Sequence, residues 1–128
     1  MIPKPNIRYL SERLAVTVSP YTFYFDYNKQ VSVQVIIPEG FVFEVSGPRV
    51  FTKLLGLGIY EKVGVAVLIH DYLYWIEGEL KMGLKLNRKF VDKLFISQLR
   101  ELGLHKWKTW LIYPAVRIGG YYYWRTIK

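Results

Sequence analysis

His70 and Asp71 stand side by side near the end of an apolar run that begins at Val63. Such a run is typical of a buried segment, and burying an ionisable group without a partner is costly. A neutral imidazole and a carboxylate are also suitable ligands for a divalent cation, and an oxygen-rich set of ligands favours Mg or Mn over Zn. The pair therefore predicts either a metal site or a structural network that supplies both groups with protein partners.

Further charged residues extend this candidate site. Arg88 and Asp92 are four positions apart, so on a helix they share a face and can pair. Glu44 follows a short apolar segment and adds another carboxylate. Adjacent helical residues diverge by about 100°, so His70 and Asp71 can bind one ion only near a helix end or in a wide site. In the structural alternative, Asp71 pairs with Arg88 or a backbone group, and His70 donates to a carbonyl or a tyrosine hydroxyl.

Two helices are expected to carry most of these residues. Segment 61–75 is ambiguous, because its β-branched residues favour a strand whereas its length favours a buried helix; we predict a helix. Segment 87–103 shows the clearest helical pattern, with an apolar stripe at helical spacing. Asn87 is suited to the N-cap, and Gly103 lies where the helix would end.

The remaining helices are less regular. Arg49–Leu55 predicts a short helix that ends at Gly56 and Gly58. Lys106–Ile118 predicts a final helix, which Pro114 is expected to kink or break and Gly119-Gly120 to end. The residues of this last helix expected to face the core are Trp107, Trp110, Leu111, Ala115 and Ile118.

The first third of the chain alternates with period two and is rich in aromatic and β-branched residues, a pattern that indicates strands. With 128 residues the chain can form one domain with a sizeable core. We predict an α+β fold, with a small N-terminal antiparallel sheet followed by three main helices packed on one face. The expected organisation is an extended arm at 1–12, a β region at 14–43, a helical region at 49–118 and an aromatic tail at 119–128.

Composition limits the possible partners. The formal charge is +8, which suits nucleic acid, an envelope polymer or an acidic protein, although the basic residues are scattered. The aromatic tail, together with Arg117 and Arg125, could stack on nucleic acid bases. This indication is weak, because tyrosine and tryptophan also fit half-buried positions of a sheet or core. There are no cysteines, which removes disulfides and thiolate metal sites. No apolar run reaches the roughly 18 residues of a membrane-spanning helix, so no membrane insertion is expected.

Several of these residues form motifs in a fixed order. His70-Asp71-Tyr72-Leu73-Tyr74 reads HD-x-LY, and Arg88, Asp92 and Phe95 then follow as R-x-x-x-D-x-x-F. Together with an end that reads Y-x-A-V-R-x-x-G, these motifs resemble the small phage and prophage proteins catalogued as domain of unknown function 1353 (DUF1353). The other matching residues are Gly40-Phe41, Ser46, Pro48-Arg49, Tyr113, Ala115-Val116-Arg117 and Gly120.

The resemblance covers roughly residues 40–120 and implies a phage or prophage origin. The family has Thr-Asp where this chain has Phe43-Glu44, so Glu44 keeps a carboxylate with a longer reach. The resemblance also implies that six residues meet in one polar cluster. These residues are Glu44, His70, Asp71, Arg88, Asp92 and Arg117.

The first functional hypothesis is a phage-encoded accessory protein with a metal-dependent, hydrolase-like site. A divalent metal ion would be held by His70 with Asp71, Asp92 or Glu44. Arg88 and Arg117 would stabilise an anionic substrate or transition state, so His70, Asp71, Arg88, Asp92 and Arg117 are the candidate catalytic residues. The alternative is a non-enzymatic virion or host-interaction protein that binds a phage or host protein. Either hypothesis places the protein in the host cytoplasm or the virion.

Overall fold

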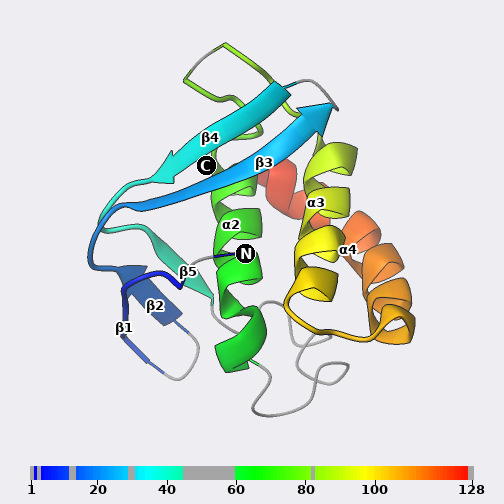
Figure 1. Ribbon diagram of the computed structural model, residues 1–128, viewed down its shortest axis with the longest axis horizontal. Coiled ribbons are helices and arrows are strands. Elements are labelled where there is room, and N and C mark those ends of the chain that lie inside the picture. Colours follow the sequence, from blue (N-terminus) through cyan, green and yellow to red (C-terminus); the bar gives the residue numbers. More distant parts are fainter. Residues whose placement is uncertain are drawn as a thin grey trace.

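The computed structural model describes residues 2, 4–11, 14–28, 31–44, 60–81 and 83–126, without the side chains of residues 44, 60–63 and 119–126. Among these residues strands come first and three helices follow, so the predicted α+β class is confirmed (Figure 1). The predicted short helix at 49–55 lies outside the described residues.

Five strands lie within the described ranges, and they form two antiparallel sheets rather than the single sheet expected. One sheet has the order β1-β2-β5, and the other is a hairpin of β3 and β4. The segment expected to be an extended arm contributes β1, which pairs with β2. The strands are β1 (Ile7–Tyr9), β2 (Leu14–Thr17), β3 (Tyr21–Asn28), β4 (Val31–Ile37) and β5 (Val42–Glu44).

The β3–β4 hairpin lies across the helices in Figure 1, and alternate residues of both strands belong to the buried core. Phe23 of β3 pairs with Val35 of β4, and both are buried, whereas the next residue of β3, Tyr24, is exposed. This is the alternation expected of a sheet with one face on the core. The ring centroid of Phe25 lies 5.7 Å from that of Phe90, at the start of α3 (Arg88–Glu101). The hairpin is thereby fixed against the helix that carries Asp92.

Helix α2 (Tyr60–Trp75) confirms the prediction for the ambiguous segment. Its residues 65–69 are all buried, as expected for a helix with neighbours on several sides. It contacts β5 on one side and α3 and α4 (Lys106–Thr126) on others. A strand would have needed neighbouring strands to satisfy its backbone, whereas a helix satisfies most of its own.

Helix α3 follows the prediction closely. The side chain of Asn87 accepts a hydrogen bond of 2.7 Å from the backbone N–H of Phe90, which is the N-cap contact expected. Val91, Phe95 and Leu99 are almost fully buried. This spacing turns one face of α3 toward α2 and places Asp92 on the same inner side of the helix.

Helix α4 differs from the prediction in its extent. It is not broken at Pro114 and does not end at Gly119-Gly120. Proline removes one N–H, and the carbonyl that loses its donor belongs to Trp110. Both residues are exposed, so water can satisfy that carbonyl. Glycine weakens a helix without ending it, and the segment expected to be an aromatic tail continues the helix to Thr126.

The buried face of α4 is also not the one predicted. Trp107, Trp110 and Ile118 are 61%, 75% and 75% exposed, and Leu111 is exposed as well. The buried residues are instead Thr109, Ile112 and Val116, at intervals of three and four. Because apolar residues occur on every side of α4, the pattern did not identify the inner face. Of the predicted core residues, Ala115 alone packs against the core.

A polar cluster centred on Asp92

The side chain of Asp92 has no exposed surface, and four side chains surround its carboxylate. Oδ1 lies 2.9 Å from His70 Nε2 and accepts a hydrogen bond of 2.5 Å from the Tyr74 hydroxyl. Oδ2 accepts hydrogen bonds from Arg117 Nη1 at 2.9 Å and Arg88 Nη1 at 3.4 Å. An ionised carboxylate only accepts hydrogen bonds, so His70 Nε2 carries a proton and donates it.

Three helices supply this cluster. His70 and Tyr74 are four residues apart on α2, Arg88 and Asp92 are four apart on α3, and Arg117 lies on α4. Residues four apart on a helix share a face, so each helix directs its side chains to one point. Arg88 Nη1 also donates to the backbone carbonyl of Arg117 at 2.9 Å, which joins α3 directly to α4. The cluster therefore fixes the relative positions of all three helices.

The guanidinium groups of Arg88 and Arg117 compensate for the cost of burying the Asp92 carboxylate. A carboxylate without partners in the protein interior would be strongly unfavourable. Arg117 is 31% exposed and His70 is 11% exposed, so the cluster meets solvent through its donors. The ring of His70 also packs against those of Tyr74, at a centroid distance of 4.3 Å, and Phe95, at 4.5 Å. The imidazole is thereby held in one orientation.

Burial raises the pKa of the Tyr74 hydroxyl, and the hydrogen bond to Asp92 and the negative charge of Asp92 raise it further. The nearby Arg88 lowers it, with a smaller effect. The hydroxyl therefore stays protonated well into the alkaline range and continues to donate to Asp92.

We expect Tyr74→Phe to destabilise the protein by about 2 kcal/mol at neutral pH, because a hydrogen bond to a buried charged group is lost. A tyrosine pKa raised by folding stabilises the protein fully below its unfolded pKa of about 10, and this contribution is lost as the pH rises beyond it. Urea denaturation from pH 7 to pH 11 should therefore show a weaker alkaline loss of stability in the variant than in the wild type. Equal pH dependence in both proteins would contradict this role of Tyr74.

The structure brings together four of the residues predicted for the site, namely His70, Arg88, Asp92 and Arg117. Asp71 is half-buried and takes part in an interaction. It is not one of the four donors to Asp92, since an ionised carboxylate only accepts hydrogen bonds. The side chain of Glu44 lies outside the described residues, although its backbone pairs with Leu14 in the sheet.

The environment of Asp92 does not suit a divalent cation. Both carboxylate oxygens of Asp92 already accept hydrogen bonds. Two of the donors are the guanidinium groups of Arg88 and Arg117, which stay charged and would repel a metal ion. In the part of the chain that the structure describes, no three residues among His, Cys, Asp and Glu are grouped so as to hold a metal ion. Metal binding through the other predicted ligands remains a prediction.

Sequence reasoning missed Tyr74 as a member of the cluster. The signal was present, because Tyr74 follows His70 by four residues and must share its face on a helix. Phe95 belongs to one of the sequence motifs, but its contact with the His70 ring depends on how α2 and α3 pack together. Helical spacing alone does not supply that information.

These features define an α+β fold in which helices α2, α3 and α4 are joined through one buried aspartate. The family described as "Protein of unknown function (DUF1353)" matches residues 21–116. The chain belongs to this family, as the motifs indicated. Comparison with curated proteins and with solved structures gave no match. Among the described residues, none of the helices has both the length and the apolar character needed to cross a membrane.

Proposed function

We propose that this protein is a non-catalytic accessory protein that acts by binding another protein. The observation that supports this proposal is the complete burial of Asp92 with both oxygens occupied. A carboxylate that serves as a base, nucleophile or metal ligand needs an oxygen within reach of its target. Here those oxygens hold the helices together, so the cluster acts as a scaffold.

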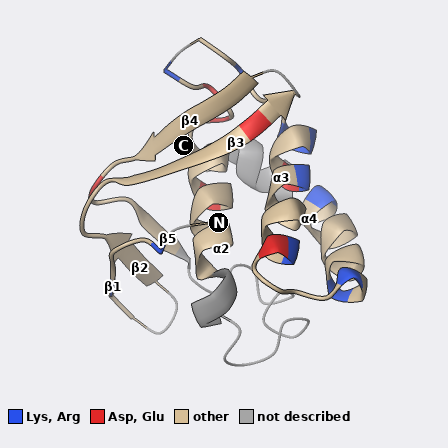
Figure 2. Ribbon diagram, viewed as in Figure 1, with Lys and Arg blue, Asp and Glu red and all other residues tan. Residues whose placement is uncertain are grey.

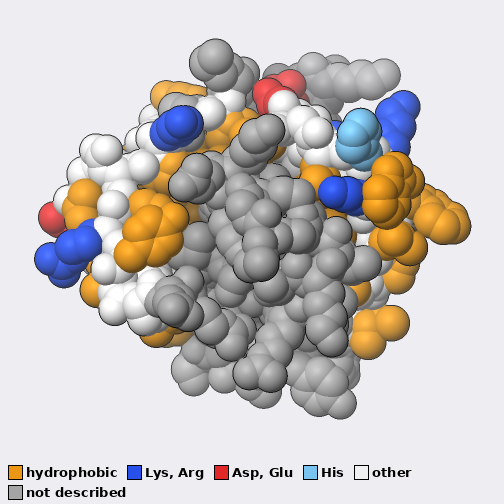
Figure 3. Space-filling view, turned by 90° about the horizontal axis from the view of Figure 1, so that it is seen from below, with side chains coloured by type: hydrophobic (Ala, Val, Ile, Leu, Met, Phe, Trp, Pro, Cys, Tyr) orange, Lys and Arg blue, Asp and Glu red, His pale blue; other side chains and the backbone are white. Residues whose placement is uncertain are grey.

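The surface of α4 supports a binding role. Trp107, Trp110 and Ile118 are more than half exposed, and large apolar side chains gathered on a surface mark interaction sites. Figure 3 shows hydrophobic and basic side chains side by side at the right of the view, on the side of the molecule where α4 lies. Tryptophan is also among the residues that contribute most to protein interfaces.

The resemblance to phage and prophage proteins favours a partner among phage or host proteins. Mass spectrometry of purified phage particles would distinguish a partner in the virion from a partner in the host cell. Stoichiometric copies of the protein in particles would indicate a virion partner. Its presence in infected cells but not in particles would indicate a partner in the host cytoplasm.

The competing hypothesis, a metal-dependent hydrolase-like site, leads to a direct test. We expect purified wild-type protein and His70→Ala to contain no stoichiometric divalent metal by mass spectrometry, and neither to hydrolyse p-nitrophenyl acetate or bis-p-nitrophenyl phosphate above background. Stoichiometric metal, or hydrolysis, that is present in the wild type and lost in His70→Ala would overturn the non-catalytic proposal. His105→Ala, which alters an exposed histidine, is the matched control.

A further inference from the structure

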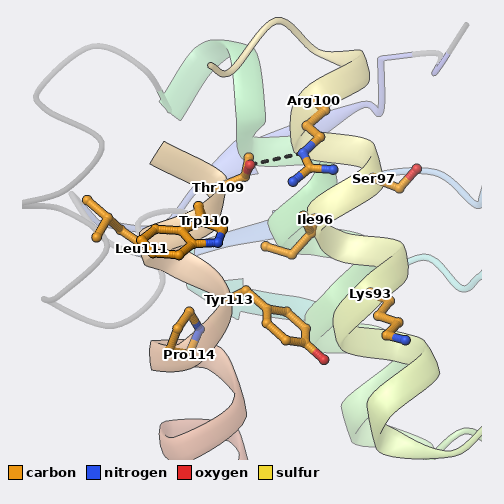
Figure 4. Close-up of a pocket in the computed structure, with 9 residues that line it drawn as sticks. All are labelled: Lys93, Ile96, Ser97, Arg100, Thr109, Trp110, Leu111, Tyr113 and Pro114. Carbon is orange, nitrogen blue, oxygen red and sulfur yellow. Dashed lines mark hydrogen bonds between the residues drawn. The ribbon is translucent and has the colours of Figure 1, made fainter. Parts of the chain in front are cut away.

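A groove of about 780 Å³ runs between α3 and α4, and the nine side chains that line it come from these two helices (Figure 4). None of these nine residues is a member of the Asp92 cluster. A groove between two packed helices has the shape into which a third helix fits.

The middle of the groove is apolar. Ile96 of α3 is only 7% exposed and forms part of its base, and Tyr113 of α4 is half-buried beside it. Trp110 and Leu111 are exposed on the α4 side, where Figure 4 shows the indole of Trp110 between Leu111 and Tyr113. The groove thus offers apolar contacts to a side chain that enters it and an exposed indole to cover that side chain.

Two cations flank this apolar centre along α3. Lys93 and Arg100 are seven residues apart, which corresponds to about 10.5 Å along the helix axis, and Figure 4 shows them on either side of Ile96. Arg100 Nε donates to Thr109 Oγ1 at 3.0 Å, so its position is fixed against α4. The nine lining residues include no carboxylate. The positive charge of the groove is therefore not neutralised from within it.

We infer that this groove binds an acidic amphipathic helix of a partner protein. The bound helix places apolar side chains over Ile96 and Trp110, and carboxylates seven residues apart meet Lys93 and Arg100. Seven residues return to nearly the same helical face, so one face can carry both charges with apolar residues between them. This inference rests on the proposed binding function and names the partner's chemistry.

The observations favour a peptide helix over other occupants. A nucleic acid strand follows rows of cations beside stacking rings, whereas this groove has two cations separated by an apolar base. A lipid surface contacts convex apolar residues, whereas Ile96 lies at the base of a groove. Figure 2 shows that basic residues are frequent on α3 and α4, so general attraction of anions requires a matched control.

The test uses a displayed library of 20-residue helical peptides in which both the apolar and charged positions are randomised. Selection on the full-length protein should enrich peptides with two acidic residues seven apart and apolar residues between them. Binding of an enriched peptide, measured by fluorescence anisotropy, should weaken at least tenfold in Lys93→Glu and in Trp110→Ala. Lys89→Glu makes the same change of charge on α3 outside the groove, and Trp75→Ala removes a half-exposed tryptophan of α2. Each should weaken binding less than threefold.

Replacing the two acidic residues of the peptide by lysine should abolish binding to the wild type and restore it partly to Lys93→Glu. The inference is overturned if no acidic helical peptide is enriched, or if Lys93→Glu and Lys89→Glu weaken binding equally. It is also overturned if oligo-dT or anionic phosphatidylglycerol vesicles bind with the same dependence on Trp110. These outcomes do not affect the proposal of a non-catalytic protein, which depends separately on the metal and hydrolysis measurements.

Discussion

Asp92→Ala should lower the free energy of unfolding by about 3–5 kcal/mol, the cost typical of breaking a buried ion pair from one side. The substitution removes the acceptor for four donors on three helices. Native domains are stable by only about 5–15 kcal/mol, so the midpoint of thermal unfolding should fall by roughly 10 °C or more. Thermal and urea denaturation followed by circular dichroism measure both quantities.

Two further variants separate the charge of Asp92 from its volume and from general effects. Asp92→Asn keeps the volume but brings an amide donor against the existing donors, so it should also lose at least about 2 kcal/mol. Asp26→Ala alters an exposed carboxylate on β3 and should change stability by less than about 0.5 kcal/mol. A loss below about 1 kcal/mol in Asp92→Ala would show that the cluster does not hold the helices together.

Local pattern predicted the elements that have a single inner face. Helix α3 has its apolar residues on one side and polar residues on the other, and its cap and its buried stripe agree with the prediction. Helix α2 was correctly predicted from its length, although its residues favour a strand by propensity, because burial on several sides outweighs propensity.

Local pattern failed on α4, where apolar residues occur all round the helix. Transfer of tryptophan from water is favourable, so Trp107 and Trp110 were expected inside. The observed inner face instead contains Thr109, whose hydroxyl accepts a hydrogen bond from Arg100 and donates one to the Lys106 carbonyl. Burying a threonine whose hydroxyl has both hydrogen-bond partners costs little free energy. The inner face of α4 therefore depends on the partners that α3 offers, and the sequence of α4 alone does not identify it.

The members of the polar cluster were predictable only in part, again because their positions depend on how neighbouring helices pack. The i, i+4 spacing of Arg88 and Asp92 and the family motifs brought four of the residues together correctly. Which carboxylate occupies the centre depends on how α2 packs on α3. The observed packing turns His70 and Tyr74 toward Asp92. Asp71 is adjacent to His70 and so projects about 100° away.

Gly78→Ala is expected to destabilise the protein by about 2–5 kcal/mol through the turn that connects α2 to α3. Helix α2 ends at Trp75. Glu77 then has a φ of 51°, and Gly78 N–H donates to the Leu73 carbonyl at 2.9 Å, a pattern typical of helix C-termini. Gly78 itself has a φ of 74°, and a Cβ there would clash with the backbone oxygen of Leu86. The left-handed conformation costs about 1–2 kcal/mol for a residue with a side chain, and overpacking against fixed backbone adds about 1–3 kcal/mol.

The backbone near Gly78 has little freedom to relieve this clash, because Leu86 N–H donates to the Gly78 carbonyl at 2.8 Å and the Leu86 side chain is fully buried. Gly83→Ala is the matched control, since Gly83 lies in the same connection between α2 and α3 with a φ of 90°, and an added Cβ there meets nothing within 4 Å. It should lose only the conformational cost, about 1–2 kcal/mol. Urea denaturation of the two variants measures the difference, and equal losses would show that the approach of Leu86 to Gly78 does not constrain the turn.

The clash in Gly78→Ala should also displace the backbone at Leu86. Because Leu86 precedes Arg88 by two residues, this displacement should weaken the contact between Arg88 and Asp92. The double variant Gly78→Ala with Arg88→Ala should therefore lose less stability than the sum of the two single losses.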